Sequence, residues 1–148
     1  MPELSTRSEM NLRTCHPDLQ RVFRQVARDE PIEIIWGHRN KLAQNSVFAG
    51  GFSKFPWPLS KHNSLPSHAI DVMPVPIDWK NIRAFERLGD IIRKIAAELS
   101  VPLRWGADWN ENGRSDDERF LDYAHWEIVK RPKAVPDRPP IPKTGAAA

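Results

Sequence analysis

Two histidines and an aspartate fall within ten residues of one another in the segment SKHNSLPSHAIDVMP, residues 60–74. Imidazole nitrogens and carboxylate oxygens are ligands of catalytic zinc, which needs three protein ligands, an open position for water and a nearby general base. His62, His68 and Asp71 are therefore candidate ligands. The chemistry that they predict is metal-assisted hydrolysis.

Asp71 interrupts the apolar run AIDVMP, which has the composition of a strand. A carboxylate inside a sheet is costly unless a cation or hydrogen-bond donors compensate for its lost hydration. Two interpretations follow from the spacing alone. Asp71 either binds a metal, or it caps a turn or pairs with an arginine.

A second polar cluster lies at DYAHWE, residues 122–127. In a strand that starts at His125, alternation turns His125 and Glu127 to one face and Trp126 to the other. A lone histidine in such a strand is more often structural than a ligand, so both roles stay open. His125 could still complete a ligand set with His62 and Asp71, and two carboxylates would then lie near it.

Regular elements must bring these distant segments together. Apolar residues at helical spacing predict one helix starting after His16-Pro17 and another over 81–99. A short helix is predicted from Lys41 to Phe48, closed by two glycines. Apolar, β-branched runs predict strands at 32–36, 69–75, 101–105 and 125–129.

Long loops are predicted at residues 52–67 and 106–120, and loops of this length are commonly functional. The order of elements predicts an α+β fold, with about three helices packed on a small, mainly antiparallel sheet. We expect a single domain over residues 1–130. Residues 131–148 are proline-rich, which predicts an extended or disordered tail.

Composition narrows the classes of protein to which the chain can belong. The chain has 148 residues, of which 40% are hydrophobic, and its single cysteine, Cys15, excludes an intramolecular disulfide and is expected in the core. No segment has the pattern of a signal peptide or a membrane span. The net charge of +3 favours polyanionic partners such as nucleic acid or wall polymers.

Five short motifs occur in one order along the chain: GHR with Gln44 five positions after its arginine, SKH, AID, RWGADW and DYAHWE. With them, the chain resembles the zinc peptidases that include phage L-alanyl-D-glutamate endolysins and D-Ala-D-Ala carboxypeptidases of the vancomycin-resistance type. The similarity runs from about Ser8 to Ile128. LRTCHPDLQRVF and SKHNSLPS are especially like the endolysins.

The resemblance implies a site that holds one zinc ion per chain, with His62, Asp71 and His125 as its ligands. Asp122 would be the base that deprotonates the attacking water, and Arg39 would stabilise the oxyanion. The residues implied to bind substrate or support the site are Ser60 and Gln44. Trp105 and Trp109 of the RWGADW motif could line the cleft or pack in the core; we favour packing for Trp105, and both roles stay open for Trp109.

Two features depart from the family pattern. Eight residues separate His62 from Asp71 where six are usual, and we expect His68, in the extended loop, to lie outside the ligand set. The base is an aspartate where other members have glutamate, so Glu127 is an alternative base. We favour Asp122, because Glu127 lies about 6–7 Å further along the strand than His125.

The expected function is that of an endolysin, which hydrolyses the L-Ala-D-Glu bond of the peptidoglycan stem peptide. We expect a monomer that is made in the host cytoplasm without a signal peptide and acts on the cell wall once the inner membrane is open. The main alternative is a D-Ala-D-Ala carboxypeptidase. A basic nucleic-acid-binding module is a further alternative, supported only by the charge and the tail.

Overall fold

The structure is a computed structural model that describes residues 3–111 and 122–130. In chain order its elements are α1 (Thr6–Arg13), α2 (Pro17–Asp29), β1 (Ile32–Trp36), α3 (Lys41–Ala49), the 3-10 helix η1 (Lys61–Asn63), β2 (Ala69–Pro74), α4 (Ile82–Glu98), β3 (Leu103–Trp105) and β4 (His125–Ile128). The expected α+β class is confirmed. Two expectations fall on residues outside this description, namely the tail at 131–148 and most of the loop at 106–120.

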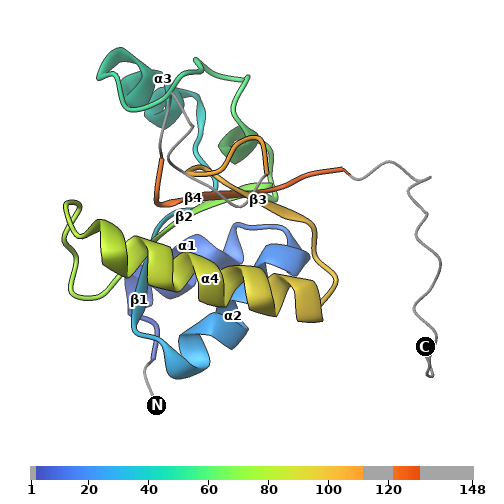
Figure 1. Cartoon of the computed structure of the whole chain (residues 1–148). Helices are drawn as coiled ribbons and strands as arrows, with labels where there is room; N and C mark the ends of the chain where they lie inside the picture. The colour runs from blue at the N-terminus through green and yellow to red at the C-terminus, as the bar shows by residue number, and fades with distance from the viewer. Residues whose placement is uncertain (1–2, 112–121, 131–148) are drawn as a thin grey trace.

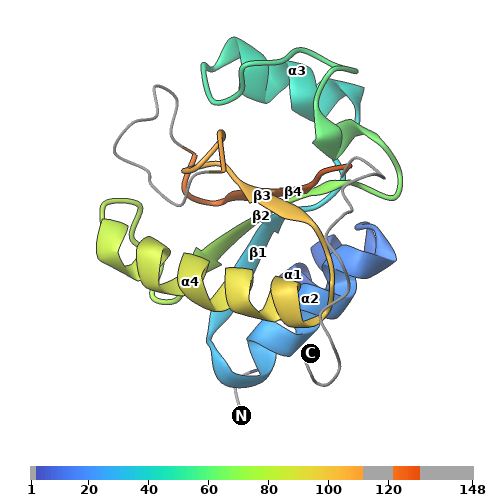
Figure 2. The ribbon, with the colours of Figure 1, turned by 45° about the vertical axis from the view of Figure 1, so that its right-hand side comes forward.

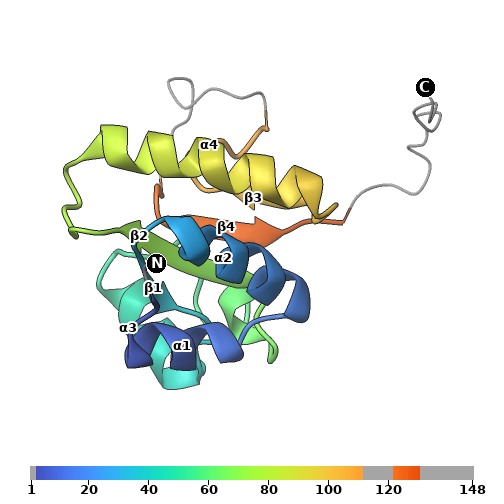
Figure 3. The same ribbon diagram turned by 90° about the horizontal axis from the view of Figure 1, so that it is seen from below.

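The four strands form one sheet in the order β1-β2-β4-β3, with every neighbouring pair antiparallel. Helices α1, α2 and α4 cover one face of this sheet, and α3 lies on the other side (Figures 1 and 2). Seen from below, α2 lies in front of β2, α4 runs beside β3 and β4, and α1 lies at the β1 edge of the sheet (Figure 3). The sheet therefore separates a helical layer from the smaller α3 lobe.

The core lies between the sheet and the three covering helices. Helix α2 buries Leu19, Val22, Phe23 and Val26, the residues whose spacing predicted it. Trp105 of β3 and Trp126 of β4 stack at 5.3 Å between ring centroids on the same side of the sheet. Burying each large apolar side chain contributes roughly 1.5–3 kcal/mol, so this layer anchors the strands that carry the polar residues.

Helix α1 is an α-helix that the sequence did not predict, and it brings the number of α-helices in the described residues to four. Its buried residues are Ser8 and Leu12, too few to give an apolar period. Ser8 is held by polar contacts instead, because its hydroxyl donates to Glu33 at 2.9 Å and accepts from the backbone N–H of Ile34 at 2.8 Å. A helix docked through a buried serine leaves little trace in a hydrophobicity pattern.

Within the described residues, no helix is both long and apolar enough to cross a membrane.

Gly37, at the end of β1, lies against α1 more closely than any side chain allows. A Cβ atom there would come within 2.3 Å of both the carbonyl oxygen of Asn11 and Oγ1 of Thr14. The carbonyl of Gly37 also accepts a 2.7 Å hydrogen bond from Nδ1 of His62. Gly37 thus admits the close approach of α1 because it has no side chain, and it orients a predicted ligand through its carbonyl oxygen.

We expect Gly37→Ala to destabilise the protein by about 1–3 kcal/mol, because backbone atoms must move to admit the methyl group. Gly50→Ala is the matched control, since the tightest contact of its Cβ would be the ring of Phe52 at 3.1 Å, and Phe52 is 78% exposed. Urea unfolding followed by circular dichroism measures both variants. Equal unfolding midpoints for the two would contradict the close approach at Gly37.

Candidate metal centre

The candidate site lies on the face of the sheet that looks away from the three covering helices. Pairing of β2 with β4 places Asp71 opposite His125, and pairing of β3 with β4 places Arg104 opposite Glu127. Because successive residues of a strand point to opposite faces, these four side chains share one face while Trp105 and Trp126 take the other. The predicted sharing of a face by His125 and Glu127 is confirmed.

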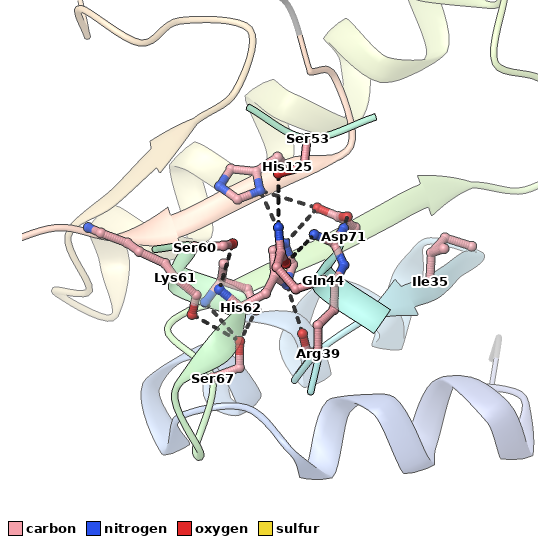
Figure 4. A network of polar contacts seen from close by, with 12 residues as sticks. Ile35, Arg39, Gln44, Ser53, Ser60, Lys61, His62, Ser67, Asp71 and His125 are labelled. Carbon is pink, nitrogen blue, oxygen red and sulfur yellow. Dashed lines mark hydrogen bonds and ion pairs between the residues drawn. The ribbon is translucent and has the colours of Figure 1, made fainter. Parts of the chain in front are cut away.

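His62, Asp71 and His125 converge at one point (Figure 4). Three atoms form a triangle with equal sides: His62 Nε2 lies 3.3 Å from Asp71 Oδ1 and 3.3 Å from His125 Nδ1, and His125 Nδ1 lies 3.3 Å from Asp71 Oδ1. Tetrahedral ligands at zinc distances of 2.0–2.1 Å lie about 3.3–3.4 Å apart. The triangle thus has the dimensions of three zinc ligands.

Hydrogen bonds fix which nitrogen of each ring faces that point. Nδ1 of His62 lies 2.7 Å from the carbonyl oxygen of Gly37, which can only accept, so Nδ1 carries the proton and Nε2 keeps its lone pair. Nε2 of His125 lies 2.8 Å from Oε1 of Glu127, so it donates there and leaves Nδ1 as the free acceptor. Partners of this kind orient metal-binding histidines in proteins.

The two carboxylate oxygens of Asp71 have different surroundings. Its Oδ2 accepts a 2.9 Å hydrogen bond from Nη2 of Arg39, while its Oδ1, also buried, has no hydrogen-bond partner. Burial alone would raise the pKa of Asp71, but its electrostatic interactions with His62 and His125 hold it well below its ordinary value. An ionised, buried oxygen without a donor is what a bound cation would compensate.

The two candidate bases have opposite surroundings. Burial alone would raise the pKa of Glu127, but hydrogen bonds from His125 and Arg104 outweigh it and lower the value to about 2. Burial and the negative charge of Asp71 raise the pKa of Asp122 to about 6. Glu127 is therefore committed to holding His125, whereas Asp122 has the proton affinity of a base working near neutral pH.

The supporting residues form a buried network around Arg39. Nη1 of Arg39 donates to Oε1 of Gln44 at 3.2 Å, and the amide nitrogen of Gln44 donates to the carbonyl of Phe55 at 2.7 Å. Ser60 caps η1, because its hydroxyl accepts from the backbone N–H of His62 at 3.2 Å. Gln44 thus connects α3 and the 50–60 loop to Arg39, and Ser60 holds the turn that carries His62.

A cavity of about 360 Å³ opens beside the triangle, and Asp122, His62 and His125 line it. Trp109 also lines it, with its ring 5.4 Å from that of His125. The structure thus brings Trp109 to the cavity wall. Its neighbour Trp105 packs in the core, as the sequence favoured.

His68 lies apart from the triangle. Its Nδ1 is 3.0 Å from the hydroxyl of Ser64, and its ring is 5.3 Å from that of His16. Among the described residues, the group of potential metal ligands is His62, Asp71 and His125. This geometry agrees with the expectation that the longer loop moves His68 away from the site.

Sequence reasoning missed the two cavity-lining cations that contact Glu127, namely Lys61 and Arg104. Nη2 of Arg104 donates to Oε2 of Glu127 at 2.6 Å, and Nζ of Lys61 lies 3.4 Å from the same oxygen. Lys61 is next to the predicted ligand His62 in the sequence, and Arg104 is the first residue of the RWGADW motif. The missing signal was the strand pairing that sets Arg104 opposite Glu127.

Comparison with known proteins places the chain among peptidases. The family profile for phage L-alanyl-D-glutamate peptidases matches residues 2–129. The chain belongs to this family. Its relative in Escherichia phage T5, an L-alanyl-D-glutamate peptidase, is 36% identical over 132 residues, which cover 82% of this chain and 94% of that protein.

One solved structure agrees with this membership. The L-Ala D-Glu endopeptidase ChiX of Serratia marcescens matches with a TM-score of 0.67 at 28% identity, over 86% of this chain and 90% of that chain. The vancomycin-resistance D,D-dipeptidase VanXYg, solved with a D-Ala-D-Ala phosphinate analogue, has a TM-score of 0.48 at 21% identity, over 78% of this chain and 49% of that chain. The second likeness is too weak to bear on function.

We expect zinc content to separate His62 from His68. His62→Ala removes one of the three predicted ligand atoms and should lose most of its zinc, whereas His68→Ala should keep about one zinc ion per chain. Elemental analysis of freshly purified protein measures both. A zinc-free His68→Ala protein beside a loaded His62→Ala protein would reverse the ligand assignment.

Proposed function

We propose that this protein is a zinc-dependent peptidase that hydrolyses the amide bond between L-alanine and D-glutamate in the peptidoglycan stem peptide. The observation that carries the proposal is the triangle of donor atoms 3.3 Å apart, in which Asp71 Oδ1 has no hydrogen-bond donor. The bond is inferred from family membership and from the names of the phage T5 and Serratia enzymes.

The donor set suits zinc, because two imidazole nitrogens and one carboxylate oxygen are ligands that catalytic zinc accepts with its fourth position open. Bound there, zinc would act as a Lewis acid that polarises the scissile carbonyl and makes water acidic enough to ionise near neutral pH. Glu127 and Gly37 support this role by fixing the ring nitrogens that face the ion.

Asp122 is proposed as the general base. In this role its carboxylate takes a proton from the attacking water, and the water oxygen bonds to the carbonyl carbon. Asp122 then returns the proton to the glutamate nitrogen as the carbon–nitrogen bond breaks. The proposal is supported by its place in the cavity beside His62 and His125 and by its pKa of about 6.

Arg39 is proposed to stabilise the negative charge that develops on the carbonyl oxygen. It lines the cavity, and its bonds to Asp71 and Gln44 hold the guanidinium in one orientation. A fixed cation of this kind complements a developing oxyanion without reorganisation during the reaction. The same contacts mean that Arg39 also positions Asp71, so both roles belong to one side chain.

The proposed setting is the bacterial cell wall, where the stem peptide is the partner and the protein acts as a monomer after the inner membrane has opened. The family's phage relative supports this setting. The net charge of +3 would favour approach to an anionic wall.

Replacing each candidate base should give different defects. Asp122→Asn should retain zinc but lose about 10²–10⁴-fold in turnover, because it removes the proton acceptor. Glu127→Gln should reduce turnover less and weaken zinc binding about 10–100-fold, because it loosens His125. Turnover assays and zinc titration test both. Full turnover in Asp122→Asn, together with no turnover in Glu127→Gln, would make Glu127 the general base instead of Asp122.

The bond itself is tested by digesting purified murein and reading the fragments by mass spectrometry. Cleavage at the proposed bond gives fragments with a newly free amine on D-glutamate. Release of single D-alanine residues from otherwise intact stems would show the carboxypeptidase alternative instead. A parallel digestion of murein with the Asp122→Asn protein controls for contaminating hydrolases.

A further inference from the structure

Arg104 holds a fixed position in the wall of the cavity next to a predicted zinc ligand. Its Nη2 donates to Glu127 at 2.6 Å, and the other carboxylate oxygen of Glu127 contacts His125 at 2.8 Å. The Arg104 guanidinium also lies 5.5 Å from the centre of the Trp109 ring. It is therefore two hydrogen bonds from His125 and is held on two sides, by a carboxylate and by an aromatic face.

The donors of this guanidinium are only partly used. Within residues 3–111 and 122–130, Glu127 is the acceptor that Arg104 bonds, and the buried Nε of Arg104 has no hydrogen-bond partner. An arginine has five N–H donors in a planar fork suited to a carboxylate. Arg104 can accordingly hold Glu127 and still offer N–H groups to a second anion.

The charge around Arg104 favours such an anion. Glu127 lies between Arg104 and Lys61, whose Nζ is 3.4 Å from the same carboxylate oxygen. One negative charge thus faces two permanent positive charges on this wall of the cavity. The excess of positive charge is fixed in place, because Lys61 also donates to the carbonyl oxygen of Ile128 at 2.8 Å.

We propose that Arg104 is a specificity residue that binds the free carboxylate of the glutamate following the scissile bond, with Lys61 adding positive charge. This inference rests on the proposed function and names the part of the substrate that the site recognises. Glutamate carries two carboxyl groups, so a peptide that continues through one of them leaves the other free. That group lies a few bonds from the scissile nitrogen, and Arg104 lines the same cavity as His125.

The proposal predicts that the protein cleaves a peptide with a free glutamate carboxylate faster than one in which that group is a carboxamide. Two synthetic stem peptides would differ only in whether the free carboxyl group of D-glutamate is a carboxylate or a carboxamide. The wild-type protein should cleave the carboxylate with a kcat/KM about 10–100-fold higher, because a charged hydrogen bond is replaced by a weak or unmade one. Most of the difference should lie in KM.

Arg104→Gln should abolish this preference by lowering kcat/KM for the carboxylate peptide to the value for the amide peptide. Any loss that comes from the contact of Arg104 with Glu127 should fall equally on both peptides, so the ratio of their kcat/KM values should approach one. Arg104→Lys, which keeps the charge but loses the fork, should retain part of the preference. Arg87→Gln is the matched control, since Arg87 is an exposed arginine of α4 that pairs with Glu30 at 2.8 Å.

Three results would overturn the proposal. Equal losses on both peptides in Arg104→Gln would mean that Arg104 acts only by holding Glu127 and His125. A preference that survives in Arg104→Gln would place recognition elsewhere. A wild-type protein that cleaves both peptides equally would refute recognition of the carboxylate while leaving the proposed function intact, whereas one that cleaves neither peptide would refute both.

Discussion

The buried carboxylate of Asp71 is the constraint on which the other polar contacts depend. Asp71 is 6% exposed in the middle of the sheet, where an ionised group is stable only if its lost hydration is replaced. Arg39 satisfies one oxygen, and this buries a guanidinium that in turn needs Gln44. Gln44 ties the network to the 50–60 loop, so the α3 lobe is fixed to the sheet by polar contacts that begin at Asp71.

Because strand side chains alternate, one face of this small sheet packs in the core and the other carries the candidate metal ligands. Trp105 and Trp126 pack under the sheet at positions next to Arg104 and Glu127, which lie above it. Each polar residue is consequently held by neighbours in the chain that are locked in a packed core. Such support is what a site needs if its ligand atoms are to stay within a few tenths of an ångström of their working positions.

The sequence predicted the elements whose packing is apolar and local. Helix α2 followed from the spacing of its buried residues, and β1 from a short β-branched run, whereas α1 docks through Ser8 and escaped notice. The ligand set came from resemblance, because spacing alone left Asp71 open to a structural role. Arg104 could not be found, since nothing local in the sequence says which residue of β4 it will face.

Two carboxylates near one histidine illustrate why environment, and not residue type, assigns the chemistry. Glu127 is surrounded by donors and cations, which lower its pKa to about 2 and leave it ionised as a fixed support for His125. Partial burial and the nearby negative charge of Asp71 raise the pKa of Asp122 to about 6. A support must not take up a proton during the reaction, whereas a base must do so and then release it. We therefore propose the shorter aspartate side chain as the base, because the strand pairing that gives Arg104 to Glu127 leaves Asp122 outside that cluster of cations.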